Sequence, residues 1–306
     1  MRSSIVVVSG FVLTIIAACG AAAPPDAIVP EITGRLEDSR IYEASGLARS
    51  QLTSGIWWVI NDNGSKEFVH AIDTSGARRG EFDLRRSRNK DWEDLASFVA
   101  DEVPYLMVAD IGDNDAKRHH RTLYFVAEPS VEKNSKATRA WQIDFRYPDG
   151  PRDAESAAVD VGEQQALILS KRDLPPQLYA VPLRAGSDEP IVATRLGSVR
   201  SLRRPRRQEI EFAPEIKSWA WQPVGMDISE DNLAAVILTY EAVYYYARQP
   251  DQTWIEALNG RPARIGIGSF KNAEAIAFSD DKREVVVTGE AKHSKLLRID
   301  FNGVTQ

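Results

Sequence analysis

The stretch Glu93-Asp94-Leu95-Ala96, followed by Tyr105-Leu106-Met107-Val108-Ala109-Asp110 and then by Thr122-Leu123-Tyr124-Phe125-Val126, decides the fold of this chain. Each piece is short and rich in aliphatic, β-branched or aromatic residues, which favours a buried strand. Turn formers separate the pieces, as in Gly112-Asp113-Asn114 between the second and the third. The stretch therefore predicts three consecutive antiparallel strands.

The same pattern recurs along the chain, as expected of a repeat fold. The intervals between successive copies are 48, 62, 71 and 48 residues. A small or acidic residue, or a methionine, marks the start of each first strand: Ser45, Glu93, Glu155, Met226 and Glu274. Each second strand has a polar end: Asn61, Asp110, Lys171, Tyr240 and Glu290.

Four antiparallel strands per repeat form the blade of a β-propeller, so we predict an all-β fold of five blades over residues 31–306. The last copy ends after its third strand, and residues 31–37 from the N-terminus would complete it and protect its edge. The 71-residue interval could hide a sixth blade, although residues 198–222 fit an insert better than four strands. A β-sandwich with accidental spacing is the other alternative.

The N-terminus predicts export. Arg2 precedes an apolar run from Ile5 to Ala18, which suits a signal peptide and is too short to span a membrane. Small residues directly before Cys19 resemble the bacterial lipobox, which implies cleavage before Cys19 and a lipid on its sulfur. We expect a signal peptide over residues 1–18 and a lipidated tether over residues 19–30, in the cell envelope (the outer membrane facing the periplasm in a Gram-negative host). A plain signal peptide with an incidental cysteine is the alternative.

Composition argues against several classes of protein. A formal net charge of -6 does not suit a nucleic-acid binder, which needs a basic face. The single cysteine rules out a disulfide framework or a cysteine-based zinc cluster, and four histidines leave little for a histidine-rich metal site. The motifs of zinc peptidases, serine hydrolases, P-loop proteins and dinucleotide-binding proteins are absent.

The repeat places acidic residues together at one mouth of the channel. Three glutamates that converge on one axis repel one another unless a cation neutralises them, and calcium prefers six to eight oxygen ligands. We therefore predict a calcium ion on the channel axis, held by Ser45, Glu93, Glu155 and Glu274. Alternatively, these side chains bond to backbone amides of the channel or line a water-filled tunnel.

The inner-strand series resembles the calcium-activated apyrases, a family of five-bladed propellers with a central calcium ion held by serines and glutamates. Met226 departs from this pattern, because the family has a serine there, and Asp227 should point away from the axis by strand alternation. The stretches Asp91-Trp92-Glu93-Asp94-Leu95-Ala96 and Asp110-Ile111-Gly112-Asp113-Asn114 also resemble a family of exported bacterial propellers without assigned activity.

Basic and acidic residues in the loops at the same mouth suggest chemistry on a phosphorylated or carboxylated ligand. The candidate catalytic residues comprise three possible general bases and one lysine that could hold developing charge: Asp62, Asp110, Asp113 and Lys171. The candidate substrate-binding residues lie at strand ends and in the adjoining loops: Asn61, Arg118, His119, Arg121, Arg172, Tyr240 and Glu290. Alternatively, the loop arginines are solvated and paired with neighbouring carboxylates.

Two functions remain open. One is a calcium-dependent hydrolase of phosphoanhydrides or phosphoesters, and the other is a non-catalytic module that binds a protein or a glycan in the envelope. A hydrolase needs Asp110, Asp113 and Lys171 to converge on open space near the cation. A binding module could have these groups paired with one another.

Overall fold

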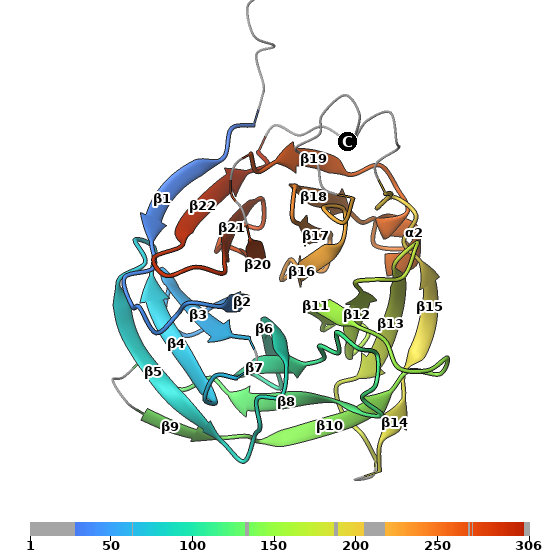
Figure 1. The fold of residues 1–306 in the computed structure, drawn as a ribbon, viewed down its shortest axis with the longest axis horizontal. Coiled ribbons are helices and arrows are strands. Elements are labelled where there is room, and N and C mark those ends of the chain that lie inside the picture. The colour runs from blue at the N-terminus through green and yellow to red at the C-terminus, as the bar shows by residue number, and fades with distance from the viewer. Residues whose placement is uncertain are drawn as a thin grey trace, which may run out of the picture.

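Five sheets surround a central axis in the computed structural model, so the predicted five-bladed propeller is confirmed (Figure 1). The structure describes residues 28–62, 64–131, 135–186, 189–204, 218–268, 270 and 272–302. Cys19, the predicted signal peptide and most of the predicted tether lie outside these residues, as does part of the predicted insert. No helix in the described ranges has the length and the apolar character needed to cross a membrane.

Each blade runs outward from the axis in chain order. The first blade contains β2 (Ala44–Arg49), β3 (Ile56–Asn61), β4 (Phe68–Asp73) and β5 (Arg78–Arg85). The second contains β6 (Trp92–Ala100), β7 (Val103–Asp110), β8 (Arg121–Ala127) and β10 (Trp141–Arg146). The third contains β11 (Ala154–Asp160), β12 (Gln165–Ser170), β13 (Gln177–Pro182) and β15 (Thr194–Ser198). The fourth contains β16 (Pro223–Ile228), β17 (Ala234–Thr239), β18 (Ala242–Ala247) and β19 (Ala263–Gly266).

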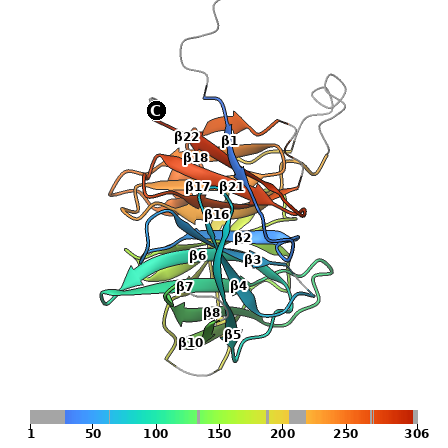
Figure 2. The same ribbon diagram turned by 90° about the vertical axis from the view of Figure 1, so that its left-hand side faces the viewer.

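The fifth blade closes the ring with strands from both ends of the chain. Its inner strands are β20 (Ala273–Phe278), β21 (Glu284–Gly289) and β22 (Lys295–Asp300), and its outer strand is β1 (Glu31–Arg35). β1 pairs antiparallel with β22, as predicted, and lies beside it on the outside of the ring (Figure 2). Gly34 is required in this position because a Cβ atom there would lie 2.1 Å from the Ser75 carbonyl oxygen.

Three short elements go beyond four strands per blade. β9 (Ser135–Thr138) adds a parallel strand outside β5, and β14 (Ile191–Val192) does the same outside β10. A helix, α2 (Trp254–Leu258), lies between β18 and β19 and begins with a capping box in which Thr253 and Glu256 bond each other's backbone amides. These additions cover outer edges and do not alter the channel.

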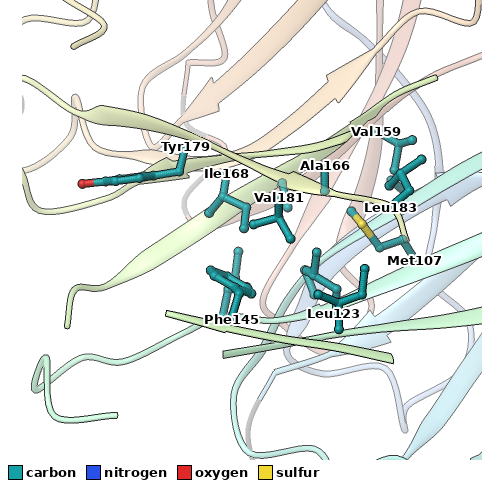
Figure 3. Packing of buried hydrophobic residues seen from close by; sticks show 14 of the residues in the cluster. Met107, Leu123, Phe145, Val159, Ala166, Ile168, Tyr179, Val181 and Leu183 are labelled. Carbon is teal, nitrogen blue, oxygen red and sulfur yellow. The ribbon is translucent and has the colours of Figure 1, made fainter. Parts of the chain in front are cut away.

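The core consists of five apolar clusters, one between each pair of neighbouring blades. Between the second and third blades, Met107, Leu123 and Phe145 face Ile168 and Val181 (Figure 3). Because the middle strands are covered on both faces, they are continuous apolar runs rather than alternating ones.

A bulge at each inner strand determines which side chains reach the mouth at the starts of these strands, here called the carboxylate mouth. The pairing with the second strand skips one residue, and that residue is Ser45, Glu93, Glu155, Val224 or Glu274. The fourth member is therefore Val224 and not Met226, which lies two residues further along. Aligning the repeats within the sequence missed Val224, because the alignment relied on polar residues and Val224 is apolar.

Asp94 fills the channel below this mouth. Its side chain is fully buried and accepts hydrogen bonds from the backbone amides of Leu95, Ala157 and Met226, at 2.8, 2.8 and 3.1 Å. These donors belong to the inner strands of three blades. Burial raises the pKa of Asp94 well above its usual range, against the effect of the three amides. Asp94 therefore ties β6, β11 and β16 together across the axis.

Asp227 makes a similar bridge between the fourth and fifth blades. One carboxyl oxygen accepts from Ile228 N and the other from Phe278 N, both at 2.8 Å. Asp227 thus joins two inner strands. The predicted direction of its side chain was counted from Met226, whereas the bulge of this strand lies at Val224. Burial raises its pKa to about 7, although Arg49 and the two amides oppose the shift.

Asp227 is expected to make the fold less stable as pH rises. A carboxyl group with a raised pKa in the folded state stabilises the fold below its unfolded pKa, near 3.8, and that contribution is lost as pH rises through about 7. The difference in free energy of unfolding between the parent chain and Asp227→Asn should therefore change across this window, by at most about 4 kcal/mol. Urea unfolding at pH 4.5, 6 and 8 measures it, and equal pH slopes in both proteins would contradict the prediction.

Candidate functional site

The carboxylate mouth is built from two rings of residues. The first ring is the bulge set, and the second ring follows the second strand of each blade at Asp62, Gly112, Lys171, Tyr240 and Glu290. At four of these positions, all except Tyr240, the backbone amide donates to the carbonyl of the residue that lies two before the bulge of the same blade. Examples are Asp62 N to Glu43 O and Lys171 N to Asp153 O. Asn61 and Asp110 therefore lie just before the second ring, at the last residues of β3 and β7.

Three carboxylates gather at this mouth between the first and second blades. Asp62, Asp91 and Glu93 each place one ligand oxygen within 4.8 Å of the others, a spacing that could hold a metal ion. Burial raises the pKa of Glu93 well above its usual range, and the negative charges of Glu155, Asp62 and Asp91 raise it further. Gly112 allows this approach because a Cβ atom there would lie 2.2 Å from Glu93 Oε1 and 2.5 Å from Asp91 Oδ2.

A lysine and a tyrosine occupy the opposite side of the mouth. The Lys171 ammonium donates to Glu155 and, at 2.9 Å, to the Tyr240 hydroxyl, which donates to Glu274 Oε1 at 2.9 Å. Burial raises the pKa of Glu155 to about 7, and burial with the charges of Glu155 and Glu290 raises that of Glu274 to about 9. Burial opposes the charged form of Lys171, but Glu155 keeps its pKa above the ordinary value.

The four expected calcium ligands thus have different surroundings. Glu93 belongs to the carboxylate group, whereas Glu155 and Glu274 bond to Lys171 and Tyr240. The Ser45 hydroxyl donates to the Trp92 carbonyl at 2.8 Å, which joins the inner strands of the first two blades. The Lys171 ammonium provides a positive charge among the glutamates that the sequence interpretation assigned to a calcium ion.

The candidate bases of the second blade are paired with arginines. Asp110 is fully buried and bonds Arg118 at 2.7 Å, and Asp113 is 5% exposed and bonds Arg121 at 2.5 Å. Asp113 also accepts from the backbone amides of Lys117 and Arg118. These bonds order the loop between β7 and β8. Neither carboxylate is therefore placed as a free base.

The same loop borders a basic pocket of about 200 Å³, lined in part by Arg118, His119, Arg121, Arg146 and Tyr147. The Nε atoms of Arg118 and Arg121 and the Tyr147 hydroxyl are buried, with no hydrogen-bond partner in the described part of the chain. All three atoms can donate, and both Nε atoms can only donate. Burial raises the pKa of Tyr147, so its hydroxyl keeps its proton. Such a pocket suits an oxyanion.

The remaining predicted residues have local roles. The Asn61 amide accepts from Tyr42 N and Glu43 N and donates to Arg40 O, so it orders the turn before β2. Arg172 bonds Asp153 at 2.7 Å. Burial raises the pKa of Glu43, and the negative charge of the half-buried Glu290 raises it further. His119 is exposed at the edge of the basic pocket.

Sequence reasoning missed Asp91, Asp94 and Tyr147. Asp91, Glu93 and Asp94 lie within four residues, which was a signal, but the sequence alone does not show which of these carboxylates faces the mouth. Tyr147 follows β10 and carried no motif. A second metal-like group, Asp38, His70 and Glu81, lies in the first blade, where Arg40 bonds Asp38 and Glu81 at 2.5 and 2.7 Å. That arginine makes it an ion-pair network.

The fold and the mouth define a five-bladed β-propeller with a carboxylate-rich channel entrance. No protein-family model matches the chain, and no curated protein matches it. Among solved structures, the PQQ-bound aldose sugar dehydrogenase of Streptomyces coelicolor is 11% identical, with a TM-score of 0.49 over 91% of this chain and 99% of that one. The gluconolactonase XC5397 of Xanthomonas campestris is 12% identical, with a TM-score of 0.45 over 91% and 98%.

Proposed function

We propose that this protein is a lipid-anchored propeller of the bacterial cell envelope that binds a calcium ion at its carboxylate mouth and a small phosphorylated ligand beside it. The observation that carries the proposal is the group formed by Asp62, Asp91 and Glu93, whose oxygens lie within 4.8 Å of one another. A cation would relieve the like-charge repulsion that raises the pKa of Glu93. The anchor rests on the sequence around Cys19.

The basic pocket supports the second ligand. Its buried donors lack acceptors in the described part of the chain, and phosphate oxygens would supply them. The loop between β7 and β8 borders both places, because Gly112 lies against Glu93 and its carbonyl accepts from Arg118 Nη1 at 2.6 Å. A phosphorylated ligand is therefore the partner class that this loop fits best.

The pairing at the mouth favours a binding module over a hydrolase. Asp110, Asp113 and Lys171 bond Arg118, Arg121 and Glu155, so hydrolysis would require these pairs to open. A calcium-dependent phosphohydrolase is the competing function, with Asp62 as its candidate base.

Calcium is expected to raise the melting temperature of the soluble form that lacks residues 1–19. At a hundredfold excess over Kd, one bound ion stabilises the fold by about 2.7 kcal/mol. Glu93→Gln should lose this response, because it removes one ligand charge while it keeps the shape of the side chain. Asp38→Asn, in the arginine-neutralised group, is the matched control and should keep it.

The same protein, loaded with calcium, then receives pyrophosphate in a calorimetric titration. We expect binding that weakens when Tyr147→Phe removes one buried donor, and no release of phosphate over hours. A melting temperature that ignores calcium would overturn the metal site. Phosphate release that Asp62→Asn abolishes would replace the binding module by the hydrolase.

A further inference from the structure

A cavity of about 520 Å³ lies at the opposite end of the channel, here called the far mouth. It is lined by the ends of all five inner strands, represented by Arg49, Ser97, Val159, Asp227 and Phe278. Propeller axes and their mouths are natural ligand sites, and this volume is within the range of small-molecule pockets. None of the predicted site residues lines it.

Asp94 separates the far mouth from the carboxylate mouth. It is fully buried and bridges the inner strands of the second, third and fourth blades above the cavity. A ligand in the far mouth would therefore not meet the Asp62–Asp91–Glu93 group. The two ends of the channel are therefore spatially separate sites.

The far mouth combines apolar walls with an acidic lining. Phe98, Val159, Ile228 and Phe278 supply apolar surface, and Asp227 is set among them with its carboxyl oxygens each held by one backbone amide. Because each carboxylate oxygen has two acceptor sites, both retain capacity for a ligand.

The cations of the far mouth are engaged at its rim. Arg49 bonds Glu230 at 2.7 Å and Asp280 at 3.5 Å, and Lys282 bonds Asp231 at 2.6 Å. No ion pair to Asp227 is found within the described ranges. The four lining carboxylates exceed the two lining cations, so an anion would be repelled and a cation attracted.

We propose that the far mouth binds a small amine with an apolar body, whose ammonium group pairs with Asp227. The ammonium compensates a half-buried carboxylate whose hydrogen bonds in the described part of the chain come from backbone amides, and the body fills the space between the phenylalanines and the aliphatic side chains. This site is separate from the function proposed for the carboxylate mouth.

The experiment compares three probes with the same ring and different head groups: tyramine, tyrosol and 4-hydroxyphenylacetate. In calorimetry at pH 8, tyramine should bind about tenfold more tightly than tyrosol, which corresponds to one partly buried charge pair. The anion should not bind. Asp227→Asn should reduce tyramine affinity to that of tyrosol, and Glu93→Gln, at the other mouth, should leave it unchanged.

A second pair of variants tests the location without touching the carboxylate. Val99 lines the cavity and Val103 does not, and both are 38% exposed. Val99→Trp should block tyramine, and Val103→Trp should not. The proposal is overturned if tyramine does not bind, if tyrosol binds equally well, or if Glu93→Gln rather than Asp227→Asn abolishes binding.

Discussion

Lys171→Met is expected to destabilise the fold by about 3–5 kcal/mol, because breaking a buried ion pair leaves an uncompensated charge. Lys171 is 6% exposed and bonds Glu155, whose own exposure is also 6%. The ammonium also lowers the pKa of Glu93 and of Glu274, so its loss affects three glutamates. Methionine keeps the length of the side chain, so the loss reports charge and hydrogen bonding rather than volume.

Guanidinium unfolding at pH 7.5, followed by tryptophan fluorescence, measures the effect. Lys171→Met combined with Glu155→Gln should recover much of the loss, since the pair is then neutral. Lys117→Met is the control, because Lys117 forms an exposed pair with Asp115 and should contribute little. A single variant as stable as the parent chain would show that the ion pair does not hold the mouth together.

Asp94→Ala is expected to cost about 3–5 kcal/mol, since it leaves three buried backbone amides without an acceptor. The donors are the amides of Leu95, Ala157 and Met226, from three blades, so the loss weakens the ring at its centre. The unfavourable burial of the carboxyl group, evident in its raised pKa, offsets part of the cost.

Asp94→Asn separates hydrogen bonding from charge. Its amide oxygen can still accept from the facing strands, so its free energy of unfolding should lie between those of the parent chain and Asp94→Ala. Asp115→Ala, exposed on the mouth loop, controls for the loss of an aspartate. If Asp94→Ala unfolds at the same denaturant concentration as this control, the bridging role is wrong.

The five blades follow from local signals. Apolar second strands such as Val108-Ala109-Asp110, with turn formers after them, predicted where each blade lies. The N-terminal strand was predicted because the last repeat lacked an outer strand, and β1 beside β22 confirms it. Such signals survive in sequence because strand burial and turn geometry constrain residue type at each position.

Local sequence patterns could not predict the register between the first and second strands of each blade. Met226 and Asp227 resemble the acidic marker of the other blades, yet the bulge of β16 lies at Val224. A bulge inserts one residue and reverses the alternation beyond it. The corresponding bulge of β6 separates Glu93, which faces the mouth, from Asp94, which crosses the axis.

The sequence by itself determined the repeat and the number of blades, because both depend on residues close together in the chain. It also indicated the ring closure and the collection of carboxylates at one mouth, because the last copy of the repeat lacked a strand and acidic residues recur at one position of the copies. The tertiary structure decided the partners: Lys171 with Glu155, Arg118 with Asp110, Arg121 with Asp113, and Asp94 with three strands. It also formed the far-mouth cavity from five inner strands. These contacts join residues from different strands and, in several cases, different blades, and which side chain reaches which partner depends on register and on distances across the axis.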